Sequence, residues 1–76
     1  MSQVFVVRGD FIQLDQLLKA TGLCGSGGQA HEAVSSGQVL VDGNTEIRKR
    51  AKLRPGQSVR FENETVVLTA ERYPRL

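Results

Sequence analysis

The apolar residues of this chain change their spacing at residue 38, and this change constrains the fold more than any other feature. Before it, two short segments carry apolar residues at the i, i+3, i+4 spacing of an amphipathic helix. The two stripes consist of Leu14, Leu17 and Leu18, then Ala30, Ala33 and Val34. After residue 38 the apolar segments are short, rich in β-branched residues and separated by turn residues. The sequence therefore predicts an α-turn-α unit followed by a small sheet.

Capping residues and glycines set the expected ends of both helices. Asp10 is the expected N-cap of the first helix, with Gln13 three residues later as its partner in a capping box. Ser26 and Gln29 give a stronger capping-box signal for the second helix. The glycines expected to end the two helices are Gly22 and Gly37. We therefore expect two short helices that pack together through their apolar stripes.

Short β-branched segments and turn dipeptides organise the rest of the chain. We expect strands over residues 4–8, 38–41, 58–61 and 65–69. The expected turns are Asp42-Gly43, Pro55-Gly56 and Asn63-Glu64. We expect the polar tail, residues 70–76, to fray. The predicted fold class is α+β, with two short packed helices on a small, mainly antiparallel sheet, in a single domain over residues 1–76.

The charges are distributed very unevenly along the chain. Residues 1–47 have a net charge of −3 and residues 61–76 a net charge of −1, whereas residues 48–60 carry six bases and no acid. The overall charge of +2 therefore hides one concentrated positive region. A charge run is usually a solvated face, but mixed signs would serve solubility better. The asymmetry favours a polyanionic partner, with nucleic acid before a membrane surface.

An extended conformation would give residues 47–54 two distinct faces, because side chains alternate along a strand. The cationic face would consist of Arg48, Arg50, Lys52 and Arg54. The other face would consist of Ile47, Ala51 and Leu53, together with Lys49. We therefore expect an apolar side that docks on the domain and a cationic side that faces solvent. A helical or irregular path would scatter the charges and weaken this arrangement.

The start of the second expected helix offers another contact for an anion. Backbone N–H groups at a helix start attract anions, and Gly27 and Gly28 leave that backbone unshielded. A compact loop-to-helix turn is the simpler interpretation of these glycines, and we favour it slightly. His31 lies one turn further on and is expected to be exposed. It is suited to contact a phosphate or a base, but an idle surface histidine is an equal alternative.

Several classes of function are poorly supported. His31 and Cys24 are the only histidine and cysteine, and neither has a sequence-local partner for a nucleophile or a metal site. We therefore expect no enzyme, no metal and no cofactor. No apolar run approaches the ~20 residues of a membrane span. A lone cysteine without a signal segment favours the cytoplasm.

The aromatic residues indicate which mode of nucleic-acid binding to expect. Phe5, Phe11 and Phe61 are expected mostly in the core, and Tyr73 lies in the tail. A stacking platform for single-stranded bases is therefore weakly supported. Recognition of structured RNA by its shape and phosphate positions fits the composition better.

Four blocks of this sequence resemble a known family. They are residues 14–18, 26–30, 37–43 and 55–59, of which the Gly-x-Val-x-Val-Asp-Gly block at 37–43 is the most specific. Together they resemble the alpha-L RNA-binding motif, the domain named after ribosomal small-subunit protein four, over about residues 12–61. Glu46, the run Arg48-Lys49-Arg50 and Lys52 further resemble the stand-alone bacterial YbcJ-like family.

The resemblance implies two helices on a small sheet, with the second helix and the following loop facing RNA. Two expected arginines of the wider family are replaced, by Gln13 and Gly27. This shifts the weight of RNA contact onto the basic segment 48–54. His31 occupies a position that is often basic in the wider family.

These observations lead us to expect a non-enzymatic, monomeric RNA-binding protein that grips the phosphates of structured RNA, such as ribosomal or transfer RNA, and associates with a ribosome or an RNA enzyme. The residues expected to carry affinity are Arg48, Lys49, Arg50, Lys52 and Arg54, with Gly27, Gly28 and His31 at the edge of the site. The alternative is a protein-interaction module whose basic face docks an acidic partner. A membrane-surface or small-anion binder is a weaker third hypothesis.

Overall fold

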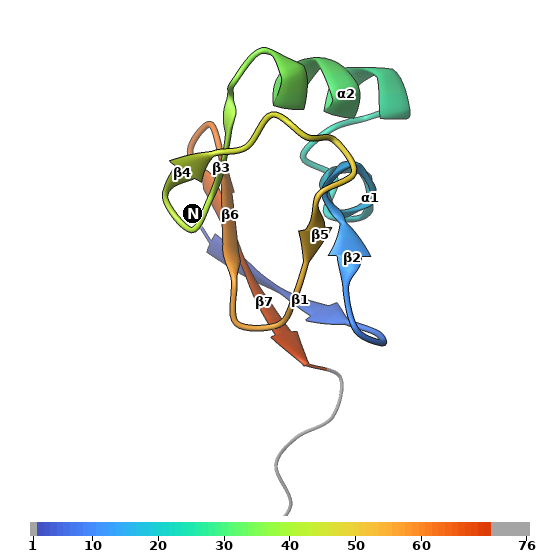
Figure 1. Ribbon diagram of the computed structural model, residues 1–76, viewed down its shortest axis with the longest axis vertical. Helices are drawn as coiled ribbons and strands as arrows, with labels where there is room; N and C mark the ends of the chain where they lie inside the picture. Colours follow the sequence, from blue (N-terminus) through green and yellow to red (C-terminus); the bar gives the residue numbers. More distant parts are fainter. Residues whose placement is uncertain (1, 71–76) are drawn as a thin grey trace, which may run out of the picture.

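The computed structural model describes residues 2–70, and within them two short helices lie beside a five-stranded sheet and a two-stranded ribbon (Figure 1). The elements in chain order are β1 (Ser2–Val7), β2 (Ile12–Gln13), α1 (Leu14–Ala20), α2 (Gly27–Ser35), β3 (Val39–Val41), β4 (Asn44–Thr45), β5 (Lys52–Leu53), β6 (Ser58–Phe61) and β7 (Glu64–Ala70). Neither helix in this part of the chain is long and apolar enough to cross a membrane.

The main sheet is mixed. Its strand order is β1-β7-β6-β3-β4, in which β1 runs parallel to β7 and all other neighbours are antiparallel. The pair β2-β5 forms a separate antiparallel ribbon next to α1 (Figure 1). The predicted α+β class, with two packed helices on a mainly antiparallel sheet, is confirmed.

The core joins the helices to one face of the main sheet. Both predicted stripes are buried, namely Leu14, Leu17 and Leu18 on α1 and Ala30, Ala33 and Val34 on α2. They belong to one cluster with sheet residues that include Val39, Val59, Val66 and Leu68. Burying each leucine contributes about 1.5–3 kcal/mol. The two helices pack together through these stripes, as the sequence predicted.

The start of α1 differs from the prediction. The helix begins at Leu14 with Gln13 as its N-cap, and Gln13 makes no side-chain capping bond, so Asp10 is not the cap. Ile12 and Gln13 are extended instead, because they pair with Leu53 and Lys52 of β5. The chain therefore cannot turn into a helix before residue 14.

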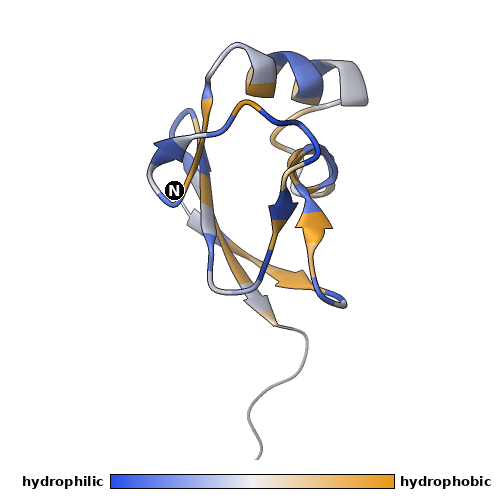
Figure 2. Ribbon diagram, in the orientation of Figure 1, coloured by the Kyte–Doolittle hydropathy of each residue, from blue (hydrophilic) through white to orange (hydrophobic). Residues whose placement is uncertain are grey.

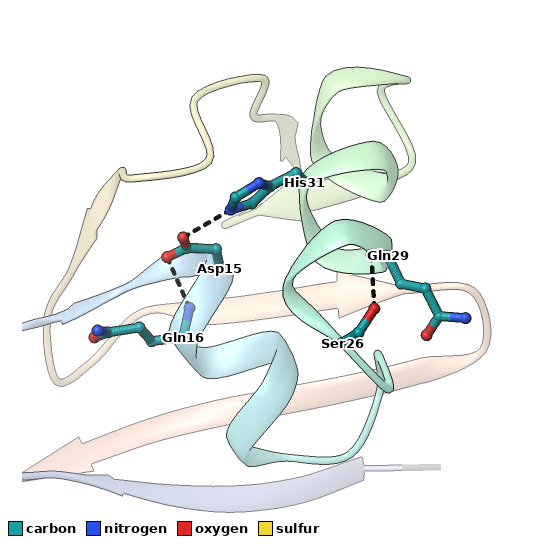
Figure 3. Close-up of polar contacts among 5 residues, drawn as sticks. All are labelled: Asp15, Gln16, Ser26, Gln29 and His31. Carbon is teal, nitrogen blue, oxygen red and sulfur yellow. Dashed lines mark hydrogen bonds and ion pairs between the residues drawn. The ribbon is translucent and has the colours of Figure 1, made fainter.

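The cap of α2 follows the prediction closely. Ser26 is the N-cap, and its hydroxyl oxygen accepts a 3.2 Å hydrogen bond from the backbone N–H of Gln29 (Figure 3). The side-chain oxygen of Gln29 accepts a 2.6 Å bond from the N–H of Gly25, one residue earlier than in a standard capping box. Gly37 follows the helix with a φ of 81°, which glycine adopts without strain.

The turns fall close to their predicted positions, and one of them is shifted by one residue. Asp42 and Gly43 have φ angles of 52° and 85°, as expected for the tight turn between β3 and β4. The last turn lies at residues 62–63 and not at Asn63-Glu64, because Glu64 already pairs with Phe61 across β6 and β7. Ala70, expected to fray, ends β7 and is paired with Val7. The rest of the expected tail lies outside the described residues.

Candidate nucleic-acid interface

The basic segment 47–54 does not run as one extended strand. Residues 49 and 50 form a turn, and the N–H of Ala51 donates a 3.1 Å hydrogen bond to the carbonyl of Arg48. Only Lys52 and Leu53 form a strand, β5. Ile47, expected to dock on the domain, is 67% exposed, and this prediction was wrong. Side chains alternate between two faces only along a strand, and the turn at residues 49 and 50 separates Ile47 from the strand that buries Leu53.

The backbone of this segment is fastened to the first turn of α1. The N–H of Leu14 donates to the carbonyl of Ala51, and the N–H of Asp15 donates to the carbonyl of Lys49, both at 2.9 Å. These carbonyls satisfy two of the N–H groups that a helix start leaves free. Ala51 and Leu53 are buried, as predicted. The segment is therefore anchored at its backbone while its charged side chains remain exposed.

The turn brings three cations to one open hollow. Arg48, Arg50 and Lys52 line it together with Ala51, and its volume is about 400 Å³. We call this surface the cationic hollow. Three of the four side chains that the extended interpretation placed on one face thus line one hollow, whereas Arg54 does not. Three like charges around one hollow repel one another, and a bound anion relieves that repulsion.

Arg48 is already engaged by an acid from its own loop. Glu46 accepts hydrogen bonds from the Nε of Arg48 at 3.0 Å, from its Nη2 at 3.3 Å and from its backbone N–H at 3.0 Å. These bonds lower the pKa of Glu46 and raise the pKa of Arg48. The sequence interpretation counted an acid-free run from residue 48 and missed the carboxylate two residues before it.

The remaining cations of the segment lie outside the lining of the hollow. Lys49 and Arg54 are exposed, and Arg54 continues the chain beyond β5.

The Nζ of Lys52 lies 5.0 Å from the centre of the Phe11 ring, in a cation–π contact. Lys52 thus connects the cationic hollow to an exposed aromatic residue that the sequence analysis placed in the core.

His31 reaches from α2 to the start of α1. Its Nε2 lies 3.1 Å from the Oδ2 of Asp15, whose Oδ1 accepts a 2.8 Å bond from the N–H of Gln16 (Figure 3). The His31 side chain is 41% exposed, against 13% for Asp15. Since the backbone N–H of Asp15 also bonds the carbonyl of Lys49, His31 stands beside the basic segment. The expected exposure of His31 is partial, and its carboxylate partner was not predicted.

Gly27 and Gly28 form the first two residues of α2. A Cβ built at Gly27 would lie 4.0 Å from the Nζ of Lys19, and one at Gly28 would lie 3.9 Å from the hydroxyl of Ser26. The backbone there is thus open, with the cation of Lys19 nearby. Among the described residues, neither glycine lines the cationic hollow. The structure therefore does not unite the helix start with the basic segment.

The described residues hold no group of three or more potential metal-ligating side chains of the His, Cys, Asp and Glu types. The three cations that line the cationic hollow are suited to bind an anion.

Comparisons with known proteins point to one family. A family model described as an S4 domain matches residues 5–69. YbcJ of Escherichia coli (strain K12) and YbcJ of Shigella flexneri are each 46% identical over 59 residues, which cover 78% of this chain and 84% of each relative. The solution structure of E. coli YbcJ, described as revealing an alpha-L motif involved in RNA-binding, matches with a TM-score of 0.66 and 39% identity. That match covers 91% of this chain and 86% of YbcJ.

The blocks that suggested the family in the sequence occupy α1, the start of α2, β3 with the turn after it, and the turn before β6 with the start of that strand. All of them fall inside the matched range. The chain belongs to the S4 domain family, with YbcJ among its relatives.

Proposed function

We propose that this protein is a non-enzymatic RNA-binding domain that holds the phosphates of structured RNA, such as ribosomal or transfer RNA, in the cationic hollow. The observation that carries the proposal is the convergence of Arg48, Arg50 and Lys52 on one hollow. The motif described for the relative YbcJ, which is involved in RNA-binding, supports the choice of RNA over other polyanions. We place the protein, as a monomer, in the cytoplasm.

The anchored backbone explains how a short loop can select a phosphate arrangement. The two bonds to α1 fix the carbonyls of Lys49 and Ala51, so the side chains of Arg50 and Lys52 extend from a defined base. Guanidinium groups bind phosphate oxygens through two parallel hydrogen bonds, whereas an ammonium acts as a point charge. Fixed spacing between such groups suits the regular phosphates of a folded RNA more than a mobile single strand.

The outlying residues extend the surface around this centre. Lys49 and Arg54 are exposed and are suited to reach phosphates next to those in the hollow. His31 is held at the edge by Asp15, and its partly exposed imidazole is suited to contact a phosphate. Gly27 and Gly28 offer open backbone near Lys19, as a separate and weaker anion contact.

A matched pair of charge reversals tests the proposal. Arg50 lines the cationic hollow, whereas Arg60 on β6 is also exposed but lines a different hollow with Leu40 and Thr65. Arg50→Glu and Arg60→Glu change the net charge of the protein equally. We expect Arg50→Glu to weaken binding to a duplex RNA at least tenfold more than Arg60→Glu, with unchanged thermal unfolding for both. Equal losses would show that only the overall charge matters and would refute the proposed site.

A further inference from the structure

A second hollow lies beside the cationic one and has a different character. Its volume is about 550 Å³, and its lining consists of Phe5, Val6, Arg8, Phe11, Ile12 and Gln16. These residues come from the end of β1, the following turn, β2 and the start of α1. We call it the Phe11 hollow. Four of its six lining residues are apolar, and the two polar ones carry hydrogen-bond donors.

The two hollows meet at Phe11 and Lys52. Phe11 is 37% exposed, and the Nζ of Lys52 lies 5.0 Å from the centre of its ring. Lys52 also lines the cationic hollow. Pairing of Gln13 with Lys52 and of Ile12 with Leu53 holds the two segments side by side. In Figure 2 the orange strand β2 lies next to the dark blue strand β5.

A nucleotide has the chemistry to occupy both hollows at once. It joins a charged phosphate to a flat aromatic base through one sugar, and here a cation and an exposed aromatic ring lie 5.0 Å apart. Base–aromatic stacking tolerates any base, because every base has a π-face. The side-chain amide of Gln16 can both donate and accept, and the guanidinium of Arg8 can donate, to the edge of a base.

The occupant must be a base that is not paired. The bases of an RNA helix are stacked inside it, whereas bases in bulges, loops and ends can turn outward and stack on a side chain. An apolar peptide is the alternative occupant of such a hollow. The cations Arg8 and Lys52 at its border favour the negatively charged nucleotide.

We propose that the Phe11 hollow binds an unpaired base adjacent to the RNA helix whose phosphates occupy the cationic hollow. This inference rests on the proposed function, since it uses the same RNA. It adds a specificity that phosphate contacts alone lack: preference for a helix flanked by an unpaired nucleotide.

The test compares two probes, a blunt RNA duplex and the same duplex with unpaired nucleotides at both ends. Wild-type protein is expected to prefer the second. Phe11→Leu keeps an apolar side chain but removes the stacking ring, and Phe11→Tyr keeps the ring. We expect Phe11→Leu to lose about 5- to 100-fold in affinity for the extended duplex and to leave the blunt duplex unchanged within about twofold. Phe11→Tyr should bind both probes like the wild type.

Val67→Ala is the matched control for loss of exposed apolar area. Val67 is exposed on β7 and does not line the Phe11 hollow within the described part of the chain. It should leave both affinities unchanged. A second measurement, the fluorescence of 2-aminopurine at the unpaired position, uses only wild-type protein and remains valid if Phe11→Leu unfolds. Stacking on Phe11 is expected to change that emission, and emission that stays constant at saturation contradicts the inference.

The outcomes separate this inference from the proposed function. If wild-type protein binds both probes equally and Arg50→Glu abolishes both, the cationic site stands and the base site is refuted. If Phe11→Leu weakens both probes alike, Phe11 has a structural role only and the base site is refuted. If wild-type protein binds neither probe, both proposals fail.

Discussion

The ion pair between Glu46 and Arg48 provides a sharp test of how the cationic hollow works. A phosphate that binds Arg48 must compete with the Glu46 carboxylate, which holds both the Nε and the Nη2 of the guanidinium. Glu46→Gln removes that competing charge. The amide oxygen of the new glutamine can still accept the hydrogen bond from the backbone N–H of Arg48, so the loop keeps its path. We therefore expect Glu46→Gln to bind RNA more tightly than the wild type.

The size of this gain follows from the exposure of the pair. The Arg48 side chain is 77% exposed, and an exposed ion pair changes an equilibrium constant by at most about fivefold. The expected gain in affinity is therefore about two- to fivefold in low salt. The slope of log affinity against log salt should stay close to that of the wild type, because Arg48 is already one of the cations that set the wild-type slope.

Fluorescence anisotropy with a labelled duplex RNA measures both quantities over a range of salt concentrations. Glu64→Gln is the matched control, because it removes the same charge from β7, away from the residues that line the cationic hollow. The control should behave like the wild type. A loss of affinity in Glu46→Gln would mean that the carboxylate orients Arg48 for RNA, and the competition argument would be refuted.

Three further predictions concern stability and the nature of the partner. Leu17→Ala should lower the free energy of unfolding by about 2–5 kcal/mol, whereas Ile47→Ala should change it by less than ~0.5 kcal/mol, as measured by urea unfolding. Hydrogen bonds from Gln57 and Ser58 lower the pKa of Asp42 below its ordinary 3.8, so its stabilising contribution is present above that value and is lost as the pH falls through the lowered pKa. Asparagine suits the φ of 52° at this position. Asp42→Asn should therefore lose less stability than the wild type when the pH falls below about 4, and equal losses of unfolding free energy in the two proteins would contradict this. RNase treatment of a cell extract should release the protein from its complexes, while complexes that survive would favour an acidic protein partner.

Local signals in the sequence were enough to predict most of the fold. The stripe around Leu17, the cap at Ser26 and the turn at Asp42-Gly43 each depend on residues within about four positions of one another. Such features can be predicted because neighbouring residues alone determine them. They placed both apolar stripes, the second helix and two of the turns closely and led to the correct fold class.

Two of the failures involve partners far apart in the chain. Asp10 was expected to cap α1, but pairing of β2 with β5, about forty residues later, keeps the chain extended to Gln13. Ile47 was expected to dock, but the loop follows the N–H groups at the start of α1, which bond the carbonyls of Lys49 and Ala51. Periodicity carries no information about such contacts.

In the candidate site, too, local features were predicted and contacts between distant residues were missed. Charge counting found Arg48, Arg50 and Lys52, and the structure places them around one hollow. The pair of His31 with Asp15 joins residues 16 positions apart, and the contact of Lys52 with Phe11 spans the β2-β5 pair. Neither could be read from the sequence, because each needs the tertiary arrangement of two elements.

The salt dependence of RNA affinity tests the central claim most directly. If about five phosphates are neutralised by the basic segment, log affinity for a duplex or hairpin RNA should fall with log salt at a slope near −3.5 to −4.5. Arg50→Ala should reduce the magnitude of that slope by ~0.7 to 0.9, while Arg60→Ala should leave it unchanged. A flat salt dependence, or a slope that Arg50→Ala does not alter, would contradict the assignment of RNA phosphates to the cationic hollow.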